Sequence, residues 1–255
     1  MKITVFNENR LTRQPFFKAL IEYLSENTDV TLRQMHKDFD GVRNLDRQID
    51  TYINADLLER KDKRYSLAFQ VFEDKDFDLS LQNENATQHI YTKPFFVESG
   101  SQLENKLSQS VVHQRLVNDT NDVKIHQSSR LDRNTETLGN YFFKCAENYP
   151  LSKLETEIYE IMGDVNAYYA LKYMTTFLLK FLKKDRVSST RPDIFVQVLE
   201  KYQWIEQVED HQYKLLVPLQ ETENKIEQTK HDSAHSFIQA QIKQTKSITP
   251  YISIN

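Results

Sequence analysis

The chain has 255 residues and a formal net charge of −4, so it is long enough for two small domains, and 15 Phe and 13 Tyr can fill their cores. Only 4 Gly and 6 Pro favour a helix-rich fold, and the sequence contains neither GxGxxG nor GxxxxGKS/T, which excludes the common phosphate-cradling loops. One cysteine excludes an intrachain disulfide and is typical of a reducing compartment. The first residues lack the apolar core of a signal peptide, and we expect a cytoplasmic protein with no membrane segment.

The charge is unevenly distributed along the chain. Residues 71–170 contain 9 basic and 16 acidic side chains, whereas residues 1–70 contain 12 and 11, and residues 171–217 contain 8 and 6. A protein that binds nucleic acid over its whole surface would be more basic than this. Any contact with DNA is therefore expected to be local.

Residues 16–67, which we call the first lobe, show the pattern of a long amphipathic helix, a short extended piece, two further helices and a hairpin. Pro15 suits the first turn of a helix, and Thr31 followed by Gln34 predicts a capping box at the second helix. Asp40-Gly41 supplies the turn before the third helix. This order is that of a winged helix, and we predict a winged helix-turn-helix domain over residues 1–70.

The third helix and the hairpin of the first lobe supply polar and basic side chains of the kind that contact DNA. Leu45, Ile49, Tyr52 and Ile53 form the predicted buried stripe of this helix. Base edges are read by hydrogen bonds, and a wing meets phosphate through cations. The predicted DNA-binding residues are Arg43, Asn44, Arg47, Gln48, Thr51, Arg60, Lys61, Lys63 and Arg64. Asp46 and Asp50 flank the same face and would repel phosphate, so a protein-binding face and a merely solvated face remain alternatives.

The middle of the chain, residues 71–165, is predicted to be an acidic segment of extended pieces and helices. Alternating β-formers in FQVFEDKDFDLSLQ and HIYTKPFFVES indicate strands or extended segments that pack on the rest of the protein. Ser101 and Glu104 open a predicted helix through Leu116. A further helix, LGNYFFKCAENY, stops at Pro150, and the next runs from a Ser152–Glu155 capping box to Gly163.

Residues 168–216, which we call the second lobe, repeat much of the first. Ile49, Tyr52, Leu57 and Leu58 align without a gap on Val196, Leu199, Trp204 and Ile205. About ten residues are missing before the last helix, which is apolar on more than one face, and the hairpin is acidic. We predict a degenerate second winged helix over residues 166–218 that packs against the middle or a second subunit, followed by a polar helical tail with a frayed end over residues 219–255.

Enzymatic patterns are weak. Asp74, Asp76 and Asp78 alternate like the start of a calcium loop, but the glycine and the closing glutamate are missing, and a solvated strand face explains them. His231 and His235 have zinc-like spacing without a third ligand. Cys145 lies in an apolar helix and is expected in the core. We expect no catalytic residue, no metal site and no cofactor.

The segments NRLTRQPFFKALIEYL, DVTLRQM and YINADLLERKDKRYSL resemble an uncharacterised domain-of-unknown-function family of streptococci and related lactic-acid bacteria. The resemblance is clearest over the first 70 residues and carries no functional residues with it. In architecture the chain also looks like proteins with two tandem winged helices. Among these, plasmid replication initiators place both on DNA, whereas acidic chromosome-condensation accessory subunits bind protein partners.

Together these patterns predict a mainly α fold with small β-hairpins, in which a helical middle joins an N-terminal and a degenerate C-terminal winged helix. The predicted function is binding of double-stranded DNA by the first lobe in a regulatory or replication-related role. The alternative is a non-enzymatic adaptor whose lobes bind protein. A homodimer or a protein partner is expected to use the second lobe.

Overall fold

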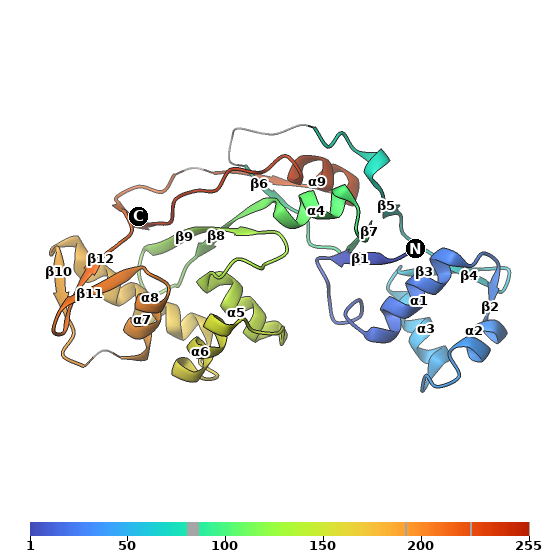
Figure 1. Cartoon of the computed structure of the whole chain (residues 1–255), viewed down its shortest axis with the longest axis horizontal. Coiled ribbons are helices and arrows are strands. Elements are labelled where there is room, and N and C mark those ends of the chain that lie inside the picture. Colours follow the sequence, from blue (N-terminus) through green and yellow to red (C-terminus); the bar gives the residue numbers. More distant parts are fainter. Residues whose placement is uncertain (81–86, 192, 225, 255) are drawn as a thin grey trace. The chain divides into compact units, whose positions relative to one another are not determined.

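The computed structural model describes residues 1–80, 87–191, 193–224 and 226–254 (Figure 1). This described part contains nine α-helices and fifteen strands in five small sheets, with 37% of residues helical and 25% in strands. The predicted mainly α fold is therefore wrong, and the fold is α+β. The additional strands come largely from segments far apart in sequence, which pair in sheets that local helical spacing does not reveal.

The chain folds into two compact units, each assembled from several segments. Unit 1 contains Met1–Gln82, His89–Gln109 and Lys230–Lys243. Unit 2 contains Asn83–Gln88, Ser110–Thr229 and Gln244–Asn255. The first lobe lies in unit 1 and the second lobe in unit 2, so each lobe has its own surroundings.

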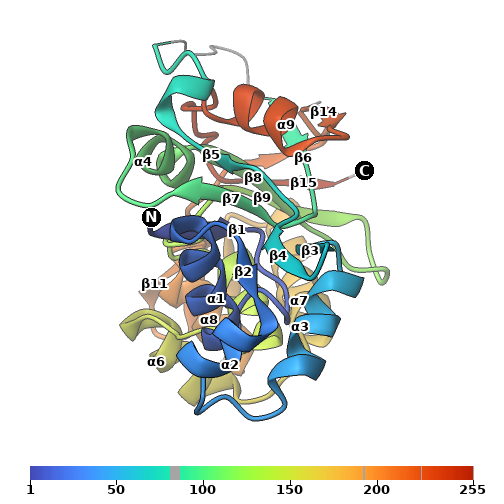
Figure 2. The same cartoon turned by 90° about the vertical axis from the view of Figure 1, so that its right-hand side faces the viewer.

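The first lobe has the helices and the hairpin that its sequence predicts. Figure 2 faces this part of the chain, with α1, α2 and α3 in shades of blue. Its elements are α1 (Pro15–Glu26), β2 (Val30–Thr31), α2 (Leu32–Asp38), α3 (Leu45–Asn54), β3 (Leu58–Lys61) and β4 (Arg64–Leu67). The three strands form an antiparallel sheet in the order β2-β4-β3. The capping box is present, because Thr31 Oγ1 accepts from the Gln34 backbone and the Gln34 side chain accepts from the Thr31 backbone.

The rest of unit 1 adds a second sheet and two helices. Its elements are β1 (Ile3–Phe6), β5 (Val71–Phe72), β7 (Phe95–Glu98), α4 (Gln102–Gln109) and α9 (Ala234–Gln241), and the sheet order is β1-β7-β5. Strands β6 (Thr87–Ile90) and β14 (Glu227–Lys230) form a separate two-stranded sheet. Asp74 belongs to a short 3₁₀ helix, η1 (Asp74–Asp76), and its Oδ1 accepts from the backbone N–H of Leu103 at 2.7 Å. This carboxylate caps α4, so the predicted strand with an acidic face is wrong here.

Unit 2 contains a four-stranded sheet in the order β13-β15-β9-β8. The strands are β8 (Val111–Leu116), β9 (Val123–Arg130), β13 (Leu219–Gln220) and β15 (Tyr251–Ile254). The helix predicted through Leu116 ends at Gln109, because Val111 and Val112 begin a strand that pairs with β9. The tail is also not a frayed end. Ile252 is fully buried and pairs with Ile125 in the middle of the sheet.

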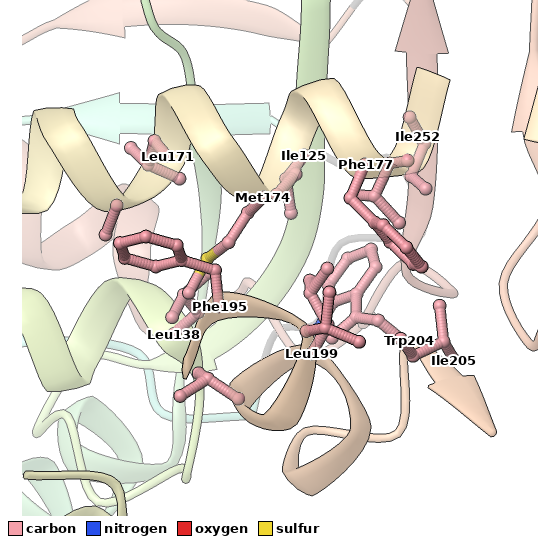
Figure 3. Packing of buried hydrophobic residues seen from close by; sticks show 14 of the residues in the cluster. Ile125, Leu138, Leu171, Met174, Phe177, Phe195, Leu199, Trp204, Ile205 and Ile252 are labelled. Atoms are coloured by element: carbon pink, nitrogen blue, oxygen red, sulfur yellow. The ribbon is translucent and has the colours of Figure 1, made fainter. Parts of the chain in front are cut away.

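The remaining helices of unit 2 and the second lobe surround one apolar core (Figure 3). The elements are α5 (Leu138–Glu147), α6 (Lys153–Met162), α7 (Ala167–Leu178), η2 (Leu179–Leu182), β10 (Arg186–Ser188), α8 (Ile194–Lys201), β11 (Ile205–Glu209) and β12 (Gln212–Leu215). Figure 3 shows Met174 of α7 and Phe195 and Leu199 of α8 pointing into the same space. The capping box of Ser152 with Glu155 is present, and Gly163, with φ of 62°, ends α6.

The two lobes share one backbone frame from their last helix onward. The backbone N–H of Leu57 donates to Tyr52 at 2.9 Å, and that of the aligned Trp204 donates to Leu199 at 2.9 Å. The preceding residue is left-handed in both lobes. The strand order β10-β12-β11 repeats β2-β4-β3, and the described residues between β10 and α8 form no counterpart of α2. In the described part of the chain, no helix is long and apolar enough to cross a membrane.

Candidate nucleic-acid interface

Helix α3 buries a single stripe and leaves the rest of its surface exposed. Leu45, Ile49 and Tyr52 are 4%, 1% and 1% exposed, and the Tyr52 hydroxyl donates to Gln14 Oε1 at 2.8 Å. Ile53, also predicted for the buried stripe, is half-buried. The stripe fixes α3 on the core of the first lobe, so Arg43, just before the helix, and Arg47, within it, lie in solvent.

Three of the predicted contact residues also have local structural roles. Gln48 is half-buried, and its Nε2 donates to the Arg43 carbonyl at 2.8 Å. The Thr51 hydroxyl donates to the Arg47 carbonyl at 2.8 Å, and Asn44 takes the left-handed conformation, φ 53°, at the start of α3. Asn tolerates that conformation better than most residues. The two arginines are therefore the longest-reaching polar groups at this face.

Two of the four cations of the hairpin contact other residues of the lobe, and the other two are exposed to solvent. Arg64 Nε lies 2.9 Å from Asp29 Oδ1, and Arg60 stacks 5.5 Å above the ring of Tyr65. These two arginines have partners within the lobe. Lys61 at the end of β3 and Lys63 in the two-residue turn are exposed, and the turn residues Asp62 and Lys63 have φ of 50° and 63°. This turn type matches the strand twist and holds both lysines at the tip.

Acidic side chains reduce the positive charge of this surface. Asp46 Oδ1 lies 2.7 Å from His36 Nε2, and both side chains are more than half exposed. Such a surface pair contributes little stability, about 0 to 1 kcal/mol. Asp50 is exposed on α3. Helix α3 contacts β3. The exposed cations of this region are Arg43 just before α3, Arg47 on α3, Lys61 at the end of β3 and Lys63 in the turn.

The second lobe uses the equivalent helix differently. Four residues of α8 are buried on two sides, Phe195, Val196, Val198 and Leu199. The helix contacts both α6 and α7, and Lys201 Nζ at its end lies 2.8 Å from Glu157 of α6. In the hairpin, Glu209 pairs with Arg186 and Glu206 pairs with Lys214. In the second lobe, the side of the helix that is exposed on α3 is therefore partly buried, and the charged residues of the hairpin pair with residues of the same lobe.

The other sequence candidates are dispersed. His231 Nε2 lies 3.1 Å from His89 Nδ1, whereas His235 stacks on Phe77 with ring centroids 4.8 Å apart. Burial, followed by the charge of His231, lowers the pKa of His89 to about 4. Cys145 is half-buried, and burial raises the pKa of its thiol, which disfavours a thiolate. Within the described residues, no cluster of three His, Cys, Asp or Glu side chains could hold a metal ion.

Sequence reasoning missed the polar side chains of β8 and β9. His113, Arg115, Lys124 and His126 lie on these strands and line or adjoin a cavity in unit 2. A helical interpretation of residues 101–116 concealed their common face. The β-branched pair Val111-Val112 and the alternation of apolar and polar residues in VKIH (residues 123–126) are the signals that could have revealed it.

A family model matches part of the chain. Residues 3–110 match the model of a family described as a domain of unknown function (DUF1803). The match covers the first lobe and extends through α4, beyond the 70 residues that carry the sequence resemblance. No curated protein matches the chain. No solved structure matches it either.

Proposed function

We propose that the first lobe is a winged helix that binds duplex DNA, in a regulatory or replication-related role. In this proposal α3 enters the major groove and the β3–β4 hairpin is the wing. Arg43 and Arg47 contact base edges or backbone, and Lys61 and Lys63 contact phosphate. One cysteine in 255 residues is typical of a reducing compartment, and the proposed location is the cytoplasm.

The observation that carries the proposal is that α3 and the hairpin that follows it both leave cations exposed. All four proposed cations are exposed, and the order of helices and strands, with β2 paired to β4, is that expected of a winged helix. The near-neutral charge of residues 1–70 fits a contact confined to a few phosphates.

The salt dependence of binding tests the wing. Fluorescence anisotropy with a mixed-sequence duplex measures the affinity at several salt concentrations. Each lost phosphate contact lowers the slope of log affinity against log salt by about 0.9, so Lys61→Gln/Lys63→Gln should lower it by about 2. The matched control is Lys183→Gln/Lys184→Gln, a pair of exposed lysines in the second lobe. An unchanged slope in the first double variant, or an equal loss in the control, would refute the wing.

The arginines are tested separately. Arg47→Ala should weaken binding by about 1 to 3 kcal/mol if the side chain reads a base, and this loss should depend on the duplex sequence. A uniform loss across sequences would assign Arg47 to the backbone. If no duplex binds even at low salt, the DNA proposal fails.

A second candidate function is a protein-interaction adaptor that uses the second lobe. Tyr168, Tyr169 and Tyr173 of α7 are 46%, 52% and 38% exposed, and the last two rings lie 4.7 Å apart. Exposed tyrosine clusters are typical of protein interfaces. A stable partner that is lost in Tyr169→Ala/Tyr173→Ala, in a protein that shifts no duplex, would favour this function over DNA binding.

A further inference from the structure

A cavity of about 550 Å³ lies in unit 2, over one face of the sheet that contains β8 and β9. In the register of this sheet, Arg115 lies opposite His126, and His126 lies opposite Tyr251. Residues directly opposite each other point to the same side of a sheet. The adjoining row, Leu116, Ile125 and Ile252, belongs to or packs against the apolar core. The sheet therefore has one apolar face and one polar face, and the cavity lies on the polar face.

Two histidines of the polar face are buried. His113 and His126 are 7% and 3% exposed, and burial lowers the pKa of both imidazoles. The ring of His126 stacks on Tyr251, with centroids 4.3 Å apart, and its Nε2 lies 2.9 Å from Ser253 Oγ. Burial of a polar group is costly unless it is hydrogen-bonded, and Ser253 Oγ supplies the partner of His126 Nε2. The contacts hold the His126 ring in one orientation beside the cavity.

Two cations at this face converge on a single carboxylate. Arg115 Nε lies 2.8 Å from Glu223 Oε1, and Lys124 Nζ lies 2.9 Å from Glu223 Oε2. Burial opposes ionisation of Glu223, but the hydrogen bond from Lys124 and the charge of Arg115 outweigh it and lower the pKa of Glu223. An arginine has five N–H donors and a lysine three, so the two cations can bind a larger oxyanion than one carboxylate.

Glu223 reaches the cations from outside the sheet. It follows β13 in the connection toward β14, whereas Arg115 and Lys124 are fixed on paired strands. The position of its carboxylate shows that Arg115 and Lys124 together bind an oxyanion. Because it lies on a connecting segment, it can be exchanged for a ligand group without disturbing the strand pairing.

We propose that this cavity binds a small metabolite through a phosphate or carboxylate group, and that this oxyanion takes the place of the Glu223 carboxylate between Arg115 and Lys124. The volume is within the range of sites for metabolites and drug-sized molecules. His113, His126 and Ile248 line the cavity and would contact the rest of the ligand. The proposal is independent of DNA binding by the first lobe.

Isothermal titration calorimetry on the full chain tests the proposal with three probes, inorganic phosphate, citrate and AMP. We expect at least one probe to bind. Glu223→Gln should tighten its binding about tenfold, because the internal competitor loses its charge, and Arg115→Gln should weaken it about tenfold or more. The matched control is Lys201→Gln, which removes a similar ion pair on α8 of the same unit and should leave the affinity within about twofold.

The probes also distinguish the sources of the oxyanion. Binding of phosphate and AMP without citrate assigns a phosphate group, and the reverse assigns a carboxylate. The proposal is overturned if neither the wild type nor Glu223→Gln binds any probe up to about 10 mM. It is equally overturned if Arg115→Gln and Lys124→Gln, shown to be folded by their thermal unfolding, retain the wild-type affinity. The gain of affinity in Glu223→Gln is a readout that loss of folding cannot imitate.

Discussion

The two lobes place the same backbone frame in different surroundings. Both have a helix that leads into a hairpin through a left-handed residue, Asp56 with φ of 54° in the first lobe and Gln203 with φ of 58° in the second. In both, a buried tyrosine of the last strand pairs with a buried valine, as Tyr65 with Val30 and as Tyr213 with Val187. The frame therefore does not decide which surface is available for binding.

What differs is the number of covered sides on the last helix. Helix α3 is held by one apolar stripe, whereas α8 is packed by α6 and α7. The described residues before α8 form no counterpart of the short helix that precedes α3. The charged side chains differ in the same way, because Glu206 and Glu209 on β11 of the second lobe pair with Lys214 on β12 and Arg186 on β10. An additional helix can thus convert an exposed face into a core face without changing the fold of the lobe.

The largest loss of stability is expected when the buried ion pair between Lys144 of α5 and Glu155 of α6 is broken. Glu155 of α6 is fully buried, and Lys144 Nζ lies 2.8 Å from its Oε2. Lys144→Met leaves a buried charge without its cation and should lower the free energy of unfolding by about 3 to 5 kcal/mol in urea titrations. Lys201→Met, which breaks the exposed pair with Glu157, should cost about 1 kcal/mol or less. Equal losses would mean that the burial of the pair is unimportant.

Helix α8 should respond to truncation as a core element. Leu199 is 1% exposed, so Leu199→Ala should cost about 2 to 5 kcal/mol. Gln197 is exposed on the same helix, and Gln197→Ala should change stability by about 0.5 kcal/mol at most. Trp204 is the only tryptophan in the sequence, so its fluorescence during urea unfolding reports the second lobe. Similar costs for both variants would contradict the buried role of α8.

Acid should destabilise unit 1 through His89. The pKa of His89 is lowered to about 4, whereas an unfolded histidine titrates near 6.5. The unfolded chain therefore binds the proton first, so this contribution is complete above pH 6.5 and is lost as the pH falls toward 4, on the order of 2 kcal/mol. His89→Gln should flatten this part of the pH profile measured by urea unfolding.

The smallest effect concerns the hairpin tips. Lys63 and His211 have φ of 63° and 58°, a conformation that favours glycine. Lys63→Gly and His211→Gly should each stabilise the protein by about 0.5 to 1 kcal/mol in thermal or urea unfolding. If the first hairpin is a wing, only Lys63→Gly should also lower the salt slope of DNA binding, by about 0.9. A reduced slope in His211→Gly would remove the proposed difference between the hairpins.

The parts that were predictable from sequence depend on contacts close in the chain. The Thr31–Gln34 and Ser152–Glu155 capping boxes lie within one helical turn. The pairing of Ile252 with Ile125 joins residues more than one hundred positions apart, and YISI at the end of a polar tail has no local partner to reveal it. Long-range pairing of this kind explains why the mainly α prediction is wrong.

The candidate sites show the same division. The sequence supplied the polar and basic inventory of α3 and its hairpin, but not the bonds of Gln48 and Thr51 to the helix backbone or of Arg64 to Asp29. The β8–β9 cavity was missed entirely. Its cations and imidazoles share a face because of strand register, and Glu223 reaches them from a distant segment.

By itself the sequence determined the first lobe, the repeat of its last helix and hairpin, and the contrast between a basic and an acidic hairpin. Helical spacing, capping residues and charge are local properties, so they can be read along the chain. Only the tertiary structure decided that α8 is covered by α6, that the tail becomes a central strand, and that a polar sheet face encloses a cavity. Burial and strand pairing depend on which distant segments meet, and a one-dimensional pattern does not contain that information.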